Sequence, residues 1–407
     1  MNFLQFGVWG AYLTSMGSYL ATTDMLSYIG MFYATQGVVS LFMPALMGII
    51  ADRWVPAQRL LGMCHLLAAT FMGGAGYYAL HLEGRGVWPL FILYALSVAF
   101  YMPTIALSYS VAYSVLEERE EDPVTAFPPI RVWGTVGFIC SMLVCDFAGF
   151  QHSAMQFIQS AVLGLILGLY CFSLPNCPVT GTKGFVEALG LRALALFKQP
   201  RMALFFIFSM LLAVSLQITN GFANPYISAF KDIPEFATSF GANHANALIS
   251  LSQLSETLCI LLIPFFLKRF GIKYVMLIAM LAWVLRFALF GLGNPGSGVW
   301  MFILSMIVYG IAFDFFNISG SLYVNDQTDD SIRSSAQGLF MLMTNGIGAT
   351  IGTLAAQGVV NHFVYSQSEG IAQIAGWQTS WLIFAAYALV VAVLFAILFK
   401  RKYVEIK

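Results

Sequence analysis

Charged side chains are scarce in this sequence. They make up 9% of its 407 residues, whereas hydrophobic residues make up 59%. A soluble domain carries roughly 25% charged residues, so this chain lacks the charge to cover a water-exposed surface, and lipid is its expected solvent. Lysine plus arginine and aspartate plus glutamate number 19 each. The sequence therefore has no excess of basic residues that would indicate a nucleic-acid partner.

Motifs for catalysis and for metal binding are also missing. The sequence has no P-loop for ATP hydrolysis, no H-E-x-x-H zinc motif and no G-x-G-D motif of intramembrane proteolysis. Its six cysteines form no C-x-x-C pair, and its five histidines lie mostly near predicted helix ends without ligand spacing. We therefore expect a protein that is not an enzyme and that holds no metal or organic cofactor.

Long hydrophobic runs are abundant, and about 20 apolar residues suffice for one transmembrane helix. The first run lacks a basic leader and a small-residue cleavage site, which favours a membrane span over a signal peptide. The sequence predicts an all-α membrane protein of twelve transmembrane helices, at 3–22, 27–51, 59–81, 88–116, 130–149, 154–174, 201–226, 244–267, 273–293, 298–322, 333–361 and 376–399.

The basic residues indicate how these spans are oriented. With the N-terminus inside, only Arg85 and Lys231 fall in outside connections, and Arg131 and Arg286 fall within spans. All the other lysines and arginines lie in inside connections or in the C-terminal tail, as the positive-inside rule requires. We expect a multi-pass protein with both termini in the cytoplasm.

The longest internal break, at 175–200, divides the chain into two halves of six spans. Residues 183–197 place apolar side chains at near-helical spacing beside Lys183, Glu187 and Arg192, which predicts an amphipathic helix at the inner interface. The expected organisation is an N-terminal half at 1–174, a cytoplasmic linker at 175–200 and a C-terminal half at 201–407. Many secondary transporters are built from two such halves.

A short basic turn follows the second span of each half. The first turn, G-I-I-A-D-R-W at 48–54, resembles the loop signature of the major facilitator superfamily, and 264–273 is its basic counterpart in the second half. The resemblance implies that Gly48, Asp52 and Arg53 help to set the conformational equilibrium. A loop that merely obeys the positive-inside rule is the alternative.

Few ionisable residues fall within the spans, and each is a functional candidate because charge is costly in the hydrocarbon core. Glu256 and Asp314 lie deep in their spans and are the strongest candidates. Arg131 could instead be a positive-inside residue at a helix start. For Arg286 a structural or snorkelling role is favoured.

Helical spacing extends these positions into polar or polar–aromatic faces, which should point inward or line water. Amides on such faces could also do no more than join helices. The faces occur on four spans and comprise Arg131, Thr135 and Phe138; Gln217 and Asn220; Gln253 and Glu256; and Tyr309, Phe313 and Asn317.

The segments that carry these faces resemble the nucleoside:proton symporter family of the major facilitator superfamily, in span order and over nearly the whole chain. The resembling segments are F-P-P-I-R-V-W-G-T at 127–135, S-L-Q-I-T-N at 215–220, S-Q-L-S-E-T at 252–257, Y-G-I-A-F-D-F-F-N at 309–317, S-A-Q-G at 335–338 and W-Q-T-S-W-L at 377–382. The segment at 221–225 departs from the family pattern.

The resemblance implies a monomeric proton-coupled nucleoside importer of the bacterial cytoplasmic membrane. It implicates Asp314 in proton coupling, and we expect Asp314 and Glu256 together to handle the proton. It places nine residues around the nucleoside: Arg131, Thr135, Phe138, Gln217, Asn220, Gln253, Glu256, Tyr309 and Phe313.

Other functions remain open at this point. The main alternative is a symporter of the same fold for another polar neutral solute such as a sugar. A non-transporting receptor on a transporter scaffold and an intramembrane enzyme are further possibilities. A proton is the expected coupling ion, because a sodium site often uses unwound backbone and the sequence shows no interrupted span.

Overall fold

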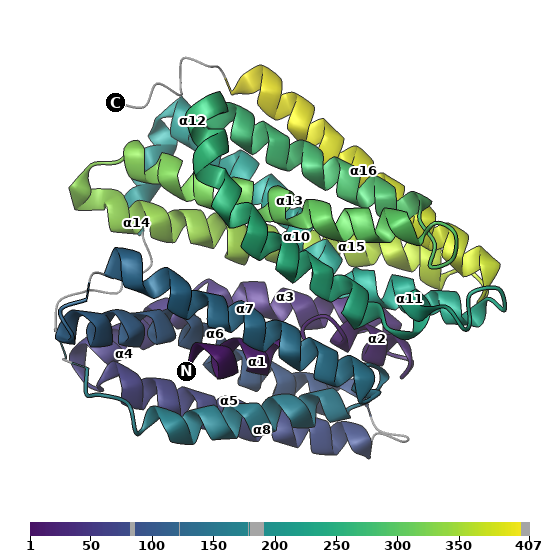
Figure 1. Ribbon diagram of the computed structural model, residues 1–407, viewed down its shortest axis with the longest axis horizontal. Coiled ribbons are helices and arrows are strands. Elements are labelled where there is room, and N and C mark those ends of the chain that lie inside the picture. The colour runs from purple at the N-terminus through teal and green to yellow at the C-terminus, as the bar shows by residue number, and fades with distance from the viewer. Residues whose placement is uncertain (82–85, 122, 178, 180–190, 400–407) are drawn as a thin grey trace. The chain divides into compact units, whose positions relative to one another are not determined.

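The computed structural model describes residues 1–81, 86–121, 123–177, 179 and 191–399, and these residues form helices and connections without a β-strand (Figure 1). The chain divides into two compact units. One comprises Met1–Met25 and Thr35–Leu189, and the other comprises Leu26–Ala34 and Gly190–Lys407. The division into halves at residues 174 and 201 remains a prediction.

The described residues of the first unit form seven α-helices, and α5 packs against both α6 and α8. One further helix, α3 (Ile29–Ser40), is shared between the two units, and short 3₁₀ turns lie at Leu26–Tyr28 and Phe150–His152. The seven helices are α1 (Asn2–Gly10), α2 (Met16–Ala21), α4 (Met43–Arg53), α5 (Ala57–Leu80), α6 (Val87–Glu118), α7 (Pro123–Phe147) and α8 (Met155–Cys171).

In the second unit, α12 packs most extensively against α13 and also against α16. Gly271 interrupts α12 with a φ of 74°, so the parts before and after this residue are separate helical segments. The elements are η3 (Leu191–Lys198), α10 (Pro200–Ala229), η4 (Phe230–Asp232), α11 (Phe240–Asn243), α12 (Ala245–Leu292), α13 (Val299–Asp326), α14 (Asp330–Met341), η5 (Leu342–Gly348), α15 (Ala349–Val360), η6 (Asn361–Tyr365) and α16 (Ile371–Leu398).

Nine helices within the described ranges are long and apolar enough to cross a membrane. This confirms an all-α protein with many spans. The three other predicted spans correspond to α1 with α2, to the 17-residue α8, and to the part of α12 before Gly271. The count of twelve therefore remains a prediction.

The expectation of uninterrupted spans is wrong for the first, second and eleventh spans. The second span is divided between α3 and α4 at Phe42, where φ is −136°. The first span is divided between α1 and α2, although the turn between them keeps helix-like hydrogen bonds such as Leu13 N to Trp9 O at 3.0 Å. The eleventh span passes through the π-helix η5, which ends where a Cβ on Gly348 would lie 2.6 Å from the carbonyl oxygen of Met210 in α10. Such a close approach requires glycine, and a π-turn shifts the face that a helix presents.

The amphipathic helix predicted at 183–197 lies mostly outside the described residues. Its described end belongs to η3, a 3₁₀-helix. The entry to the linker is fixed more firmly, because Gln58 of α5 accepts a hydrogen bond from the backbone N–H of Cys177 at 3.0 Å and donates one to Asn176 at 2.7 Å.

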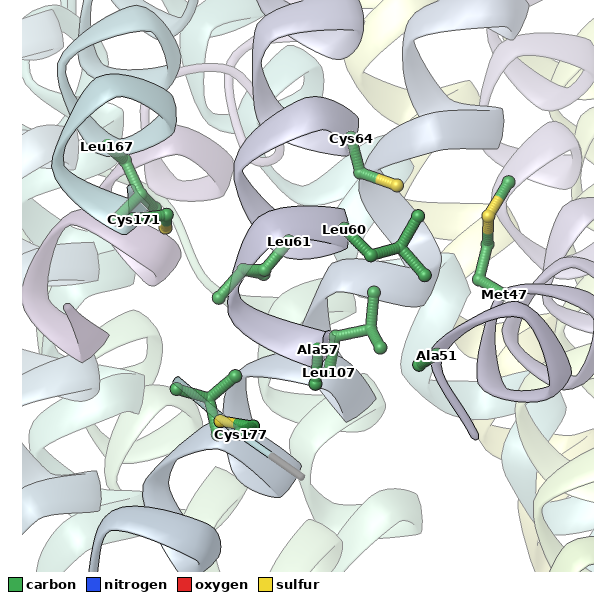
Figure 2. Close-up of a cluster of buried hydrophobic side chains, with 11 residues drawn as sticks. Met47, Ala51, Ala57, Leu60, Leu61, Cys64, Leu107, Leu167, Cys171 and Cys177 are labelled. Atoms are coloured by element: carbon green, nitrogen blue, oxygen red, sulfur yellow. The ribbon is translucent and has the colours of Figure 1, made fainter. Parts of the chain in front are cut away.

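Cys177 also completes a buried apolar cluster that supports the connection between α4 and α5. Burial raises the pKa of its thiol. Figure 2 shows the side chains converging from α4, α5, α6 and α8. The cluster consists of Met47, Ala51, Ala57, Leu60, Leu61, Cys64, Leu107, Val111, Leu167, Cys171 and Cys177.

Candidate substrate and proton site

Arg131 is the polar centre of the candidate face on α7. Its Nε donates a hydrogen bond to the Tyr109 hydroxyl of α6 at 2.8 Å, and its guanidinium carbon lies 4.0 Å from the ring centroid of Phe6 on α1. A cation above an aromatic face is stabilised by the ring quadrupole. Arg131 is half-buried, so it is oriented by two helices and still partly accessible.

Phe6 reaches Arg131 because α1 and α7 touch backbone to backbone. A Cβ on Gly137 would lie 1.9 Å from the carbonyl oxygen of Phe3, and a Cβ on Gly10 would lie 2.5 Å from that of Phe138. Glycine at both positions permits this approach, in the manner of small-residue packing between membrane helices.

The same packing sets the aromatic part of the face. Trp9 of α1 meets Phe138 edge to face, with ring centroids 6.3 Å apart and an interplanar angle of 88°. Phe138 is buried, whereas Thr135 is half-buried. The three predicted residues of α7 therefore lie in the first unit, where α1 packs against α7.

A buried network of polar side chains joins α1 to α5 and α6, and no sequence pattern pointed to this network. His65 Nε2 lies 2.6 Å from Gln5 Oε1, and Gln5 Nε2 donates to Thr104 Oγ1 at 2.7 Å. Tyr101 donates to the carbonyl oxygen of Gln5 at 2.7 Å. His65 also lines a cavity of about 10 Å³, close to the smallest volume that holds a water molecule.

In the second unit, Gln217 and Asn220 of α10 form a preorganised amide pair. Asn220 Nδ2 donates to Gln217 Oε1 at 3.0 Å, and Gln217 is 9% exposed. One turn further along, Asn224 donates to Asn246 at 2.7 Å and joins α10 to the start of α12. This second amide contact is of the helix-joining kind, and it falls in the segment where the sequence departs from the family pattern.

The two acidic candidates gather around Tyr309. A side-chain hydrogen bond joins Tyr309 to Gln253, and Tyr309 lies within electrostatic range of both Glu256 and Asp314. Its ring stacks on that of Phe313 at 5.8 Å with an interplanar angle of 12°. Asp314 is 3% exposed, and Glu256 is half-buried. Five predicted residues of α12 and α13 are therefore neighbours in space.

Gly310 explains why these two helices come so close. A Cβ at this position would lie 2.5 Å from the carbonyl oxygen of Ser255. Ser255 also donates a hydrogen bond to the carbonyl oxygen of Ile307 across the contact. The contact lies beside both Glu256 and Tyr309 in the chain, so it fixes the spacing of the acidic and aromatic groups.

The snorkelling role considered for Arg286 is wrong. Arg286 is 2% exposed, donates to the carbonyl oxygen of Ser305 at 2.6 Å and lies with its guanidinium carbon 4.7 Å from the Tyr309 ring centroid. The helix that carries it packs against α13, so the side chain is enclosed before it could reach the interface. Its position well inside the span 273–293 was the available sequence signal.

The predicted conformational loop lies at the end of α4. A Cβ added to Gly48 would meet nothing within 4 Å, and Arg53 is exposed. The side chain of Asp52 lies outside the described part of the structure. Within the ranges that the structure does describe, no three histidine, cysteine, aspartate or glutamate side chains are grouped to hold a metal ion.

Similarity to known proteins is extensive. A family model described as "Nucleoside H+ symporter" matches residues 1–403. The chain is 46% identical to the xanthosine permease of Escherichia coli K12 over 98% of this chain and 94% of that protein. It is 45% identical to the nucleoside permease NupG of the same organism over 100% of this chain and 96% of that protein.

Solved structures agree with these relatives. A crystal structure of the nucleoside transporter NupG superposes with a TM-score of 0.89 at 45% identity, covering 98% of this chain and 97% of that one. A D-xylose–proton symporter at 14% identity and a TM-score of 0.70 shows the same fold. The chain belongs to the nucleoside H+ symporter family of the major facilitator superfamily.

Proposed function

We propose that this protein is a proton-coupled symporter that imports nucleosides across the bacterial inner membrane by alternating access. The observation that carries the proposal is the gathering of Glu256, Asp314, Tyr309 and Phe313 on two apolar helices. Carboxylates at such positions are costly and mark ion or substrate pathways. Membership of the nucleoside H+ symporter family supports both the solute and the ion.

Aromatic and amide groups suit a nucleoside. The substrate is neutral, with a flat base and hydroxyl groups on the ribose. The stacked rings of Tyr309 and Phe313 offer a face for the base, and amides supply both donors and acceptors for base edges and hydroxyls. We assign substrate contact to Arg131, Thr135, Phe138, Gln217, Asn220, Gln253, Glu256, Tyr309 and Phe313.

The proposed coupling ion is a proton carried mainly by Asp314, with Glu256 chiefly binding the nucleoside. A neutral solute cannot by itself use the membrane potential, which is worth about 2.3 kcal/mol per charge per 100 mV. Asp314 is more deeply buried than Glu256. Protonation would remove its charge while the site is closed to water, and rehydration on the inner side would release the proton.

The finer topology belongs to the same proposal. We place twelve transmembrane helices in two six-helix halves, at 1–174 and 201–407, with both termini in the cytoplasm and the linker on the inner side. Gly48, Asp52 and Arg53 would then tune the inward–outward equilibrium. The protein would act as a monomer.

Uptake by purified protein in liposomes tests the function directly. An inward proton gradient should drive accumulation of radiolabelled uridine or adenosine without ATP, and an uncoupler should abolish it. Unlabelled nucleosides should compete, whereas glucose should not. Competition by glucose alone would favour a sugar symporter of the same fold, and binding without transport would favour a receptor.

A further inference from the structure

A buried cation lies behind the proposed site. Arg286, in the part of α12 after Gly271, is 2% exposed. Its Nη1 donates to the carbonyl oxygen of Ser305 at 2.6 Å and to the hydroxyl of Ser252 at 3.4 Å. Its Nε has no hydrogen-bond partner among the residues that the structure describes. These hydrogen-bond partners are neutral, and a charge enclosed with neutral partners is costly enough to indicate a function.

The contacts of Arg286 converge on Tyr309. The guanidinium carbon lies 4.7 Å from the Tyr309 ring centroid, and the Tyr309 ring also stacks on that of Phe313, with the centroids 5.8 Å apart. Ser305 returns a hydrogen bond to the carbonyl oxygen of Arg286 at 3.0 Å. The cation therefore fixes both the register of the two helices and the orientation of the ring that we assign to the substrate.

The charged groups around this ring are few. Tyr309 lies within electrostatic range of Glu256 and Asp314 as well as of Arg286, and Asp314 also lies within range of Cys259. The α16 side of this part of α12 presents aromatic rings. The α10 side presents Tyr226, whose hydroxyl donates to the backbone of α12.

We propose that Arg286 is a positioning residue of the symport site: it holds Tyr309 against Phe313 and supplies the positive charge that balances the acidic pair. With Glu256 and Asp314 both ionised, this set of three carries one net negative charge. One bound proton makes the set neutral, which is the form best suited to a conformational change in a low-dielectric environment. The proposal rests on proton-coupled nucleoside import as the function.

Arg286→Met is the decisive variant. Methionine is long and apolar, and replacing buried charge with an apolar side chain of similar size often leaves stability unchanged or raised. We expect a folded protein that still exchanges nucleoside, with gradient-driven accumulation reduced at least ~10-fold. The pH at which exchange falls to half should rise by about one unit, because loss of a nearby positive charge raises the pKa of a carboxylic acid.

Arg286→Lys separates charge from shape. The ammonium keeps the charge but lacks the planar fork and stacks less well on an aromatic ring. Its pH profile should match that of the wild type and its accumulation should be retained, while its dissociation constant for the nucleoside rises about 3- to 10-fold. Lys198→Met removes a charge from the exposed surface of η3, away from the candidate site, and should change neither the pH profile nor the accumulation.

The measurements are pH-dependent exchange and gradient-driven uptake in liposomes, with thermal stability of each purified variant. Wild-type accumulation and an unchanged pH profile in Arg286→Met would overturn the proposal, and so would loss of the folded state in that variant. Loss of accumulation in Arg286→Lys would also overturn it. A wild-type protein that does not respond to a proton gradient would instead refute the proposed function.

Discussion

Replacing Gly137 by alanine should loosen the contact that positions the candidate face of α7. The added Cβ would lie 1.9 Å from the carbonyl oxygen of Phe3, whereas an ordinary C···O contact is about 3.3 Å. The two helices must therefore separate by about 1.4 Å. Because the obstacle is backbone, no side-chain rotation can relieve it.

The energetic result follows from two opposing terms. Overpacking of this kind costs about 1–3 kcal/mol, and alanine returns about 0.5–1 kcal/mol of helix propensity. We expect a net loss of stability of about 1–2 kcal/mol. Separation also moves Phe6 away from Arg131 and Trp9 away from Phe138, so nucleoside affinity should fall together with stability.

Gly358→Ala is the matched control. This glycine is also helical, in α15, but its added Cβ would meet nothing within 4 Å. It should gain about 0.5–1 kcal/mol and keep wild-type affinity. Unfolding of the purified variants by denaturant, with calorimetric titration of uridine, would measure both effects. A Gly137→Ala protein as stable as Gly358→Ala would refute the reasoning about this contact.

Further variants test the amides. The Gln217→Ala and Gln253→Ala proteins should each remain folded. Each should bind the nucleoside more weakly by about 1–3 kcal/mol in calorimetry, because hydrogen-bonding groups of the ligand would be left unpaired. Unchanged affinity in both variants would assign these amides to helix packing. Gln58→Ala should lower the free energy of unfolding by about 1–3 kcal/mol, because it leaves the buried N–H of Cys177 unsatisfied. Gln58→Glu keeps an acceptor for that N–H and should recover part of the loss. Equal losses in both variants would contradict the assigned hydrogen bond.

The sequence predicted the helical segments and the polar faces because both depend on local spacing. Apolar runs report membrane helices, and the pairing of Gln217 with Asn220 follows from a three-residue step on one helix. The closeness of Glu256 on α12 to Tyr309 and Asp314 on α13 required more, namely that two spans pack together. The resemblance to a family supplied that expectation, and the structure brings the three groups within electrostatic range.

Contacts between distant residues could not be predicted. Gln5 and His65 belong to different helices, and nothing in the sequence around either residue identifies the other as its partner. The same holds for Arg286, whose enclosure depends on where Ser305 and Tyr309 lie on α13. The π-helix η5 was also missed, and so was the close approach of its last residue, Gly348, to Met210 of α10.

The most direct test of proton-coupled import is uptake by Asp314→Asn in proton-energised liposomes. Asparagine keeps the size of the side chain but cannot carry the proton. The variant should bind and exchange nucleoside yet fail to accumulate it against a gradient, while Glu256→Gln should weaken binding more strongly. Accumulation by Asp314→Asn at the wild-type ratio would contradict the account and make Glu256 the first alternative for the proton site.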